Sequence, residues 1–130
     1  MKRGFAYSAY ANININKSSS YFSGYLQTKL DALSEAQNTV NDVIKVFVQN
    51  GVTKEELEQS KKFLLGSEPL RVETMSQKLN RTFMEYYKGQ ELGYSAKELE
   101  SIEKLELEDL NEFIAKHTEI LDLSYAIVTK

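Results

Sequence analysis

Residues near the amino terminus alternate between apolar and polar with the period of two that is typical of half-buried β-strands. One alternation runs from Phe5 to Ile15, a polar turn follows at residues 16–19, and a second alternation runs from Ser20 to Leu30. The set that shares one face of the first segment is Phe5, Tyr7, Ala9, Ala11, Ile13 and Ile15. The pattern predicts an antiparallel β-hairpin.

After residue 30, apolar residues recur at spacings of three and four, which predicts amphipathic helices. The first predicted helix begins at a capping box formed by Ser34 and Gln37. In such a box the two side chains satisfy free amides of the first helical turn. Gly51 stands in the position at which glycine commonly ends a helix.

The clearest helix start in the chain is Thr53, which has a glutamate, Glu56, three residues later. The only proline, Pro69, follows shortly after Gly66 in the same segment. Proline removes a helical hydrogen bond and clashes with the preceding turn, so we expect the helix to be interrupted or kinked between Gly66 and Pro69.

Further helices are predicted in the carboxy-terminal half, followed by a last strand. A capping box at Thr74 opens a helix that ends at Gly89, and a box at Ser95 opens a short helix that ends near Lys104. The final helix ends near His117. Alternation over residues 121–127 predicts a strand.

The order strand, strand, several helices, strand favours an α+β fold, in which helices cover one face of an antiparallel sheet. A doubly wound parallel sheet would instead require strands and helices in regular alternation. A chain of 130 residues buries roughly two-thirds of its unfolded surface on folding, which is sufficient for a single domain over residues 1–130.

Composition excludes several classes of function. The chain has no cysteine, which excludes disulfides and thiol chemistry, and its net charge of −3 gives no basic patch for nucleic acid. No apolar run approaches the roughly 20 residues of a membrane helix, and the first residues do not resemble a signal peptide. We therefore expect a soluble chain, with no membrane contact and an undetermined compartment. Because it opens directly into strand-like sequence, we expect it to be a piece of a longer protein.

Three features are candidates for chemistry. His117 is the only histidine, and its predicted place at a helix end favours complementing the helix dipole over binding metal. A dense acidic series between residues 98 and 112 offers oxygen ligands, but its spacing around the helices favours a solvated surface. The members of this series are Glu98, Glu100, Glu103, Glu106, Glu108, Asp109 and Glu112.

Tyrosines are the third feature. The chain has eight, and Tyr7, Tyr10, Tyr21 and Tyr25 lie on the predicted hairpin. Their positions favour cross-strand packing, with a ligand-facing tyrosine in the first strand as the alternative.

Three motifs resemble one family. The sequence G-V-T-K-E-E-L at residues 51–57 and the sequence K-K-F-L-L-G-S-E-P-L-R-V-E-T at residues 61–74 together form the first motif. The second is K-R-G-F-A-Y-S at residues 2–8, and the third is the helix start at residues 105–114, with Glu106 where a capping threonine is usual. In this register they resemble the second-half domain of insulinase-like (pitrilysin) zinc peptidases.

The resemblance implies an α+β domain that forms one wall of a two-walled chamber, opposite a wall that carries zinc. The family's zinc motif is H-x-x-E-H, and this sequence does not contain it. The resemblance therefore implies that the chain is the carboxy-terminal, non-zinc-binding part of such a peptidase half. It implies no catalytic residue, metal ligand or cofactor in this chain, and zinc in the complementary domain of the parent.

The resemblance also assigns one candidate binding residue. The family's second half contributes an arginine and a tyrosine that bind the substrate backbone and the oxyanion. Tyr7 matches that tyrosine, and the matching arginine would precede Met1. The implied partner is a peptide substrate, shared with the zinc-binding domain.

Two functions are consistent with these features. The first is a wall of the substrate chamber of an active zinc metalloendopeptidase, inactive as an isolated chain. The second is a catalytically silent interaction or scaffold domain of a peptidase homologue. We also expect the segment from Phe5 to Ile15, which has neither charge nor proline, to pair with a second copy as a homodimer. A monomer whose own terminus covers this edge is the alternative.

Overall fold

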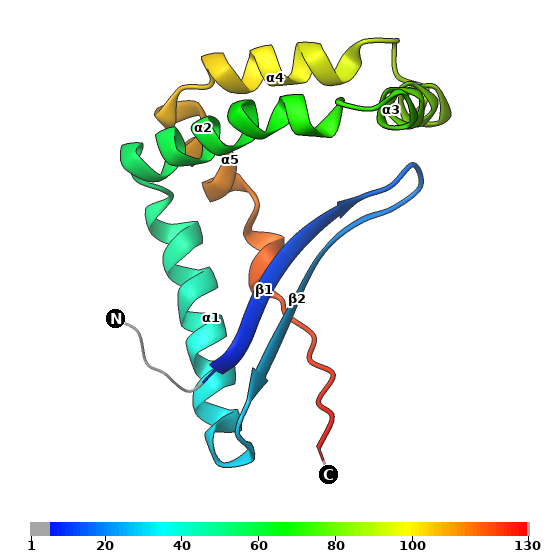
Figure 1. Ribbon diagram of the computed structural model, residues 1–130. Coiled ribbons are helices and arrows are strands. Elements are labelled where there is room, and N and C mark those ends of the chain that lie inside the picture. The colour runs from blue at the N-terminus through cyan, green and yellow to red at the C-terminus, as the bar shows by residue number, and fades with distance from the viewer. Residues whose placement is uncertain (1–5, 130) are drawn as a thin grey trace. The chain divides into compact units, whose positions relative to one another are not determined.

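The computed structural model describes residues 6–129, which divide into two compact units. The hairpin unit combines the residues up to Gly51 with those from Phe113 onward, and the helical unit is Val52–Glu112. The expected single domain over residues 1–130 stays a prediction. The elements in Figure 1 are β1 (Ala6–Ile15), β2 (Ser20–Thr28), η1 (Leu30–Ala32), α1 (Leu33–Asn50), α2 (Lys54–Arg71), α3 (Met75–Lys88), α4 (Tyr94–Lys104), α5 (Leu107–Lys116) and η2 (Thr118–Leu121).

Strands β1 and β2 form the predicted antiparallel hairpin, paired without interruption from Ser8 with Gln27 to Ile15 with Ser20. In the turn, the Asn16 amide donates to the Ser19 carbonyl at 3.2 Å. Alternate residues near the end of β2 are half-buried, whereas β1 is exposed at almost every position. The α+β class is confirmed, because the described residues form a two-stranded antiparallel sheet and several helices. Phe5, where the strand was expected to begin, lies outside the described residues.

The predicted last strand at residues 121–127 is wrong. Leu121 ends the short helix η2, and residues 123–129 form no strand or helix. A strand requires a neighbour that pairs with its backbone groups, and the only sheet of the described residues is the two-stranded hairpin. In this segment the Tyr125 hydroxyl instead donates to Asn41 Oδ1 of α1 at 2.8 Å.

Helix α1 begins one residue before the predicted cap, so the Ser34 box is wrong. The 3₁₀ turn η1 leads directly into α1, and no side chain caps the helix at Ala32. Tight turns of this kind provide early hydrogen bonds without a capping side chain. At the other end, Gly51 terminates α1 as predicted, with φ 67° and its amide bonded to the Phe47 carbonyl at 2.9 Å.

Helix α2 begins at the predicted cap. The Glu56 amide donates to Thr53 Oγ1 at 3.2 Å, and the Thr53 amide donates to Glu56 Oε2 at 2.8 Å. An interruption near Gly66 and Pro69 is wrong, because α2 continues through both to Arg71, and the alternative of a kink stays a prediction. Pro69 lies only two residues before the helix ends, so its missing amide affects the last turn alone.

Within the helical unit, Figure 1 shows α3 nearly end-on and α4 returning alongside α2, which it contacts. The Thr74 capping box of α3 is confirmed, and Gly89 ends α3 in the left-handed conformation with φ 74°. The predicted box at Ser95 is wrong, because α4 begins at Tyr94 and its N-cap is Gly93, which has no side chain that could form the box. Within residues 6–129, no helix has the length and apolar character needed to cross a membrane.

Candidate functional sites

Tyr7, the residue singled out by the family resemblance, lies near the start of β1 with 68% of its surface exposed. Strand pairing passes from Ala6 with Thr28 directly to Ser8 with Gln27, so Tyr7 is the extra residue of a β-bulge. Bulges redirect side chains and are over-represented beside active sites. Tyr7 is therefore accessible, and its role in substrate binding stays a prediction.

The hairpin carries an exposed aromatic and polar surface next to this bulge. Tyr10 and Tyr25 are paired across the strands, and their rings stack with centroids 5.4 Å apart. On the same face, Asn14 Nδ2 donates to Ser23 Oγ at 3.1 Å. The cross-strand packing predicted for the hairpin tyrosines is confirmed for Tyr10 and Tyr25. We call this surface the hairpin face, and its residues are Tyr10, Asn12, Asn14, Tyr21, Ser23 and Tyr25.

His117 immediately follows α5, as predicted. Its ring lies 4.2 Å from the Phe113 ring, centroid to centroid, and its Nδ1 lies 2.5 Å from Glu119 Oε1. Hydrogen bonding to His117 holds the pKa of the Glu119 carboxyl below its ordinary value. The residues of the acidic series between positions 98 and 112 are all exposed.

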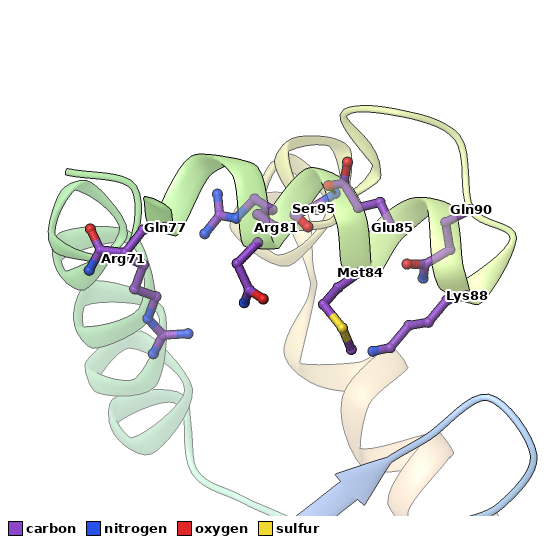
Figure 2. A pocket seen from close by; sticks show the side chains of 9 residues that line it. Arg71, Gln77, Arg81, Met84, Glu85, Lys88, Gln90 and Ser95 are labelled. Atoms are coloured by element: carbon purple, nitrogen blue, oxygen red, sulfur yellow. Dashed lines mark hydrogen bonds between the residues drawn. The ribbon is translucent and has the colours of Figure 1, made fainter. Parts of the chain in front are cut away.

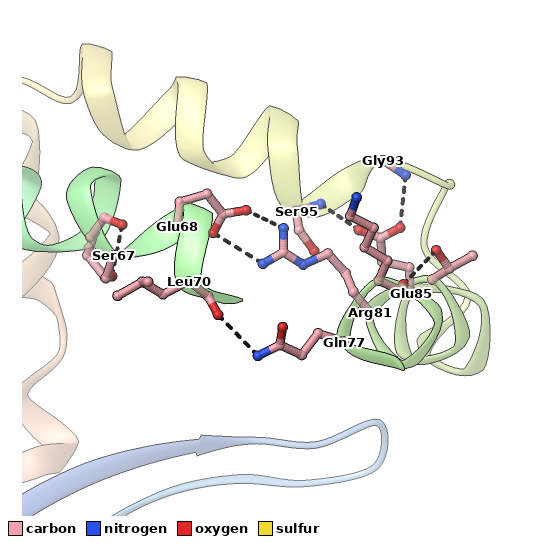
Figure 3. A network of polar contacts seen from close by, with 11 residues as sticks. Ser67, Glu68, Leu70, Gln77, Arg81, Glu85, Gly93 and Ser95 are labelled. Carbon is pink, nitrogen blue, oxygen red and sulfur yellow. Dashed lines mark hydrogen bonds and ion pairs between the residues drawn. The ribbon is translucent and has the colours of Figure 1, made fainter. Parts of the chain in front are cut away.

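Glu85 of α3 is a buried polar residue whose role the sequence did not reveal. It is only 5% exposed, although it is a glutamate. Its two oxygens accept the amides of Gly93 and Ser95, each at 2.9 Å, at the start of α4 (Figure 3). Hydrogen bonds from Ser95 and Gly93 lower the pKa of Glu85. Glu85 thus caps α4 in place of the predicted Ser95 box.

A second polar contact joins α2 to α3. Arg81 binds both carboxylate oxygens of Glu68, and the contact between Nη2 and Oε2 measures 3.1 Å (Figure 3). Both side chains are about three-quarters buried, with 26% and 23% exposed. The hydrogen bond from Arg81 lowers the pKa of Glu68. The sequence held no signal for this pair because its members are 13 residues apart on different helices.

These contacts border a polar cleft of about 280 Å³ within the helical unit. Figure 2 shows the cleft extending from the end of α2 along α3, with side chains of both helices around it. Its lining includes Arg71, Asn80, Arg81, Met84, Lys88 and Gln90. Three of these are basic, although the whole chain carries a net charge of −3.

The described residues do not fit a zinc site. The chain has one histidine and no cysteine, and no group of three or more histidine, aspartate or glutamate side chains is placed to hold a metal within residues 6–129. Zinc sites in proteins use three or four such ligands. No metal chemistry is therefore assigned to residues of this chain.

Comparison with known proteins identifies relatives. Residues 1–64 match the family model described as the Peptidase M16 inactive domain. Over 129 residues the chain is 45% identical to a protein of Helicobacter pylori (strain ATCC 700392 / 26695) named "Non-peptidase homolog YmxG". The match covers 99% of this chain and 30% of that relative. Residues 1–64 thus match the inactive domain of the M16 peptidase family, and the motifs of the whole sequence resemble the same insulinase-like family.

Proposed function

We propose that this chain is part of a catalytically silent domain of a peptidase homologue, which binds polypeptide without carrying out metal chemistry. The observation that carries the proposal is the match of residues 1–64 to the inactive domain of the family. The similarity to a relative named a non-peptidase homologue supports it further.

The hairpin is the part of the chain that we propose contacts polypeptide. Tyr7 is 68% exposed at the bulge, and the adjacent hairpin face offers further tyrosine and asparagine side chains. A tyrosine hydroxyl can donate a hydrogen bond to a peptide carbonyl, and asparagine can both donate and accept. In this proposal the hairpin forms part of the wall of a substrate-binding chamber.

A second candidate function is a chamber wall in an active zinc endopeptidase. The resemblance of residues 2–8 and 51–74 to such peptidases favours it, as does the match of Tyr7 to their substrate-binding tyrosine. In that case zinc and the partner arginine would be supplied outside this chain. The two candidates differ in turnover, whereas both require Tyr7 to contact peptide.

The test separates binding from turnover in the full-length parent protein. Incubation with quenched fluorescent peptides of mixed sequence, with and without added zinc, should give no cleavage. Fluorescein-labelled versions of those peptides should still bind, and Tyr7→Phe should weaken binding by about threefold to tenfold because one hydrogen bond is lost. Tyr86→Phe is the matched control, because Tyr86 is 76% exposed on α3.

Each outcome bears on one candidate. Zinc-dependent cleavage would overturn the silent domain and establish the second candidate. Equal binding by wild type and Tyr7→Phe would overturn the contact at the hairpin.

A further inference from the structure

The cleft along α3 presents side chains from one row of that helix. Asn80, Met84 and Lys88 are separated by four residues each, and residues at this spacing lie on the same helical face. Figure 2 shows the side chains of Met84 and Lys88 pointing to the same side of α3, with Arg71 reaching in from the end of α2. Gln90 follows the end of α3 and completes that end of the cleft.

Several polar groups of the cleft are already engaged. Arg81 is bound by Glu68, and the Glu85 carboxylate accepts two backbone amides. Gln77 accepts the Thr74 amide at 2.8 Å and donates to the Leu70 carbonyl at 3.1 Å. These groups hold the helices together and have little capacity left for a ligand.

Other polar side chains of the cleft are available to bind a ligand. The side chains of Arg71, Asn80 and Lys88 form no hydrogen bond or ion pair with any residue in the described part of the chain. Arg71 and Lys88 are cations to which no carboxylate of residues 6–129 is hydrogen-bonded, although the charge of Arg71 helps to lower the pKa of Glu68. A ligand that matches these groups is an anion with at least two charged groups.

The distance between the cations suggests an elongated ligand. The bond from Gln77 to the Leu70 carbonyl holds the first turn of α3 against the last turn of α2, which contains Arg71. Lys88 lies 11 residues after Gln77, and a helix rises about 1.5 Å per residue, so the two ends are on the order of 16 Å apart. An extended peptide covers that distance in about five residues.

We propose that the cleft binds an extended acidic peptide segment, with one carboxylate at Arg71 and a second at Lys88. Between them, the Asn80 amide donates to and accepts from the peptide backbone, and Met84 contacts an intervening side chain. A single phosphate or carboxylate ion reaches only one of the cations. The cleft volume, about 280 Å³, lies below the roughly 300–1,000 Å³ of pockets that enclose small molecules. This site goes beyond the proposed function, because it lies in the helical unit and does not involve Tyr7.

Fluorescence anisotropy with defined peptides tests the site on the 130-residue chain. The probe is a fluorescein-labelled peptide of serine and alanine with two glutamates five positions apart. We expect it to bind, and we expect a version with both glutamates replaced by glutamine to bind at least about tenfold more weakly. A peptide with adjacent glutamates should also bind more weakly, because it cannot reach both cations.

Variants locate the binding. Arg71→Gln and Lys88→Gln should each weaken binding by about tenfold, the effect of losing one charge-assisted hydrogen bond. The matched control is the double variant Lys45→Gln and Lys62→Gln, which removes two exposed cations outside the cleft and should bind like wild type. Circular dichroism of each variant shows whether it is folded, and amide shifts of wild-type α3 on titration locate the peptide without any substitution.

Three results would overturn the proposal. One is no binding by wild type at about 1 mM peptide, the limit of weak affinity. Another is equal loss of binding in the control variant, which would indicate non-specific attraction. The third is displacement of the peptide by inorganic phosphate at the same concentration, which would indicate a single-anion site.

Discussion

Different kinds of contact stabilise the hairpin and the helical unit, each within itself. In the hairpin, regular cross-strand pairing joins residues close in sequence, such as Tyr10 with Tyr25, and most side chains remain exposed. In the helical unit, a few polar side chains join distant segments. Asn111 of α5, for example, accepts the Val52 amide at 2.8 Å and donates to the Val52 carbonyl at 3.1 Å, across 59 residues.

This difference indicates where each region is sensitive to change. A two-stranded hairpin distributes its stability over many weak pairs, each of which contributes about 0.2–1 kcal/mol. A buried carboxylate can by itself contribute several times as much stability as one such pair, because its removal leaves buried donors without acceptors. We therefore expect single substitutions to have large effects at polar contacts of the helical unit and small effects on the hairpin.

The largest effect is expected at Glu85. Glu85→Ala removes the acceptor for the Gly93 and Ser95 amides and should lower the free energy of unfolding by about 3 kcal/mol. Urea denaturation followed by circular dichroism measures this change. Glu103→Ala, at an exposed glutamate of α4, is the matched control and should change stability by less than about 0.5 kcal/mol. Equal effects of the two substitutions would contradict the capping role.

Acid should weaken the same contact by protonation. Hydrogen bonds from Ser95 and Gly93 hold the pKa of Glu85 below its ordinary value, and the hydrogen bond from Arg81 does so for Glu68. A depressed pKa in the folded state contributes stability above the unfolded value of about 4.3, and this contribution is lost as pH falls through the folded pKa. Urea denaturation at pH 7 and at about pH 3 measures how much unfolding free energy is lost in acid. This loss should therefore be smaller in Glu85→Ala than in wild type. Identical losses would show that Glu85 is not ionised and bonded at neutral pH.

The sequence predicted local features and missed contacts between helices. The Thr53 and Thr74 caps, the glycine ends of α1 and α3, and the hairpin depend on residues close together in the chain, so their patterns were visible. Glu85 as the cap of α4 was not visible, because the capping side chain lies on the preceding helix, 8 and 10 residues before the amides that it accepts. The last strand was predicted from alternation alone, although a strand also needs a pairing partner.

A smaller effect is expected at the Thr53 cap. Thr53→Ala removes the hydroxyl that accepts the Glu56 amide at 3.2 Å and should lower the free energy of unfolding by about 1 kcal/mol. The matched control is Ser60→Ala, which removes an exposed hydroxyl within α2. A melting curve of Thr53→Ala that coincides with that of the control would show that the cap contributes nothing. The expected value is smaller than at Glu85 because the amides at an exposed helix start can bond to water.

The smallest effect is expected from the stacked pair Tyr10 and Tyr25. Their rings are 5.4 Å apart with planes 23° apart, but the side chains remain 59% and 49% exposed. Cross-strand pairs contribute roughly 0.2–1 kcal/mol, and exposure leaves little burial to add. A double-mutant cycle of Tyr10→Ala and Tyr25→Ala should therefore give a coupling free energy of about 0.5 kcal/mol. The control is a cycle of Tyr10→Ala with Tyr86→Ala. Tyr86 lies in the other unit, so this cycle should give no coupling free energy. A coupling between Tyr10 and Tyr25 as large as the loss at Glu85 would contradict the contrast between the two regions, because it would mean that one exposed hairpin pair stabilises the fold as strongly as a buried carboxylate.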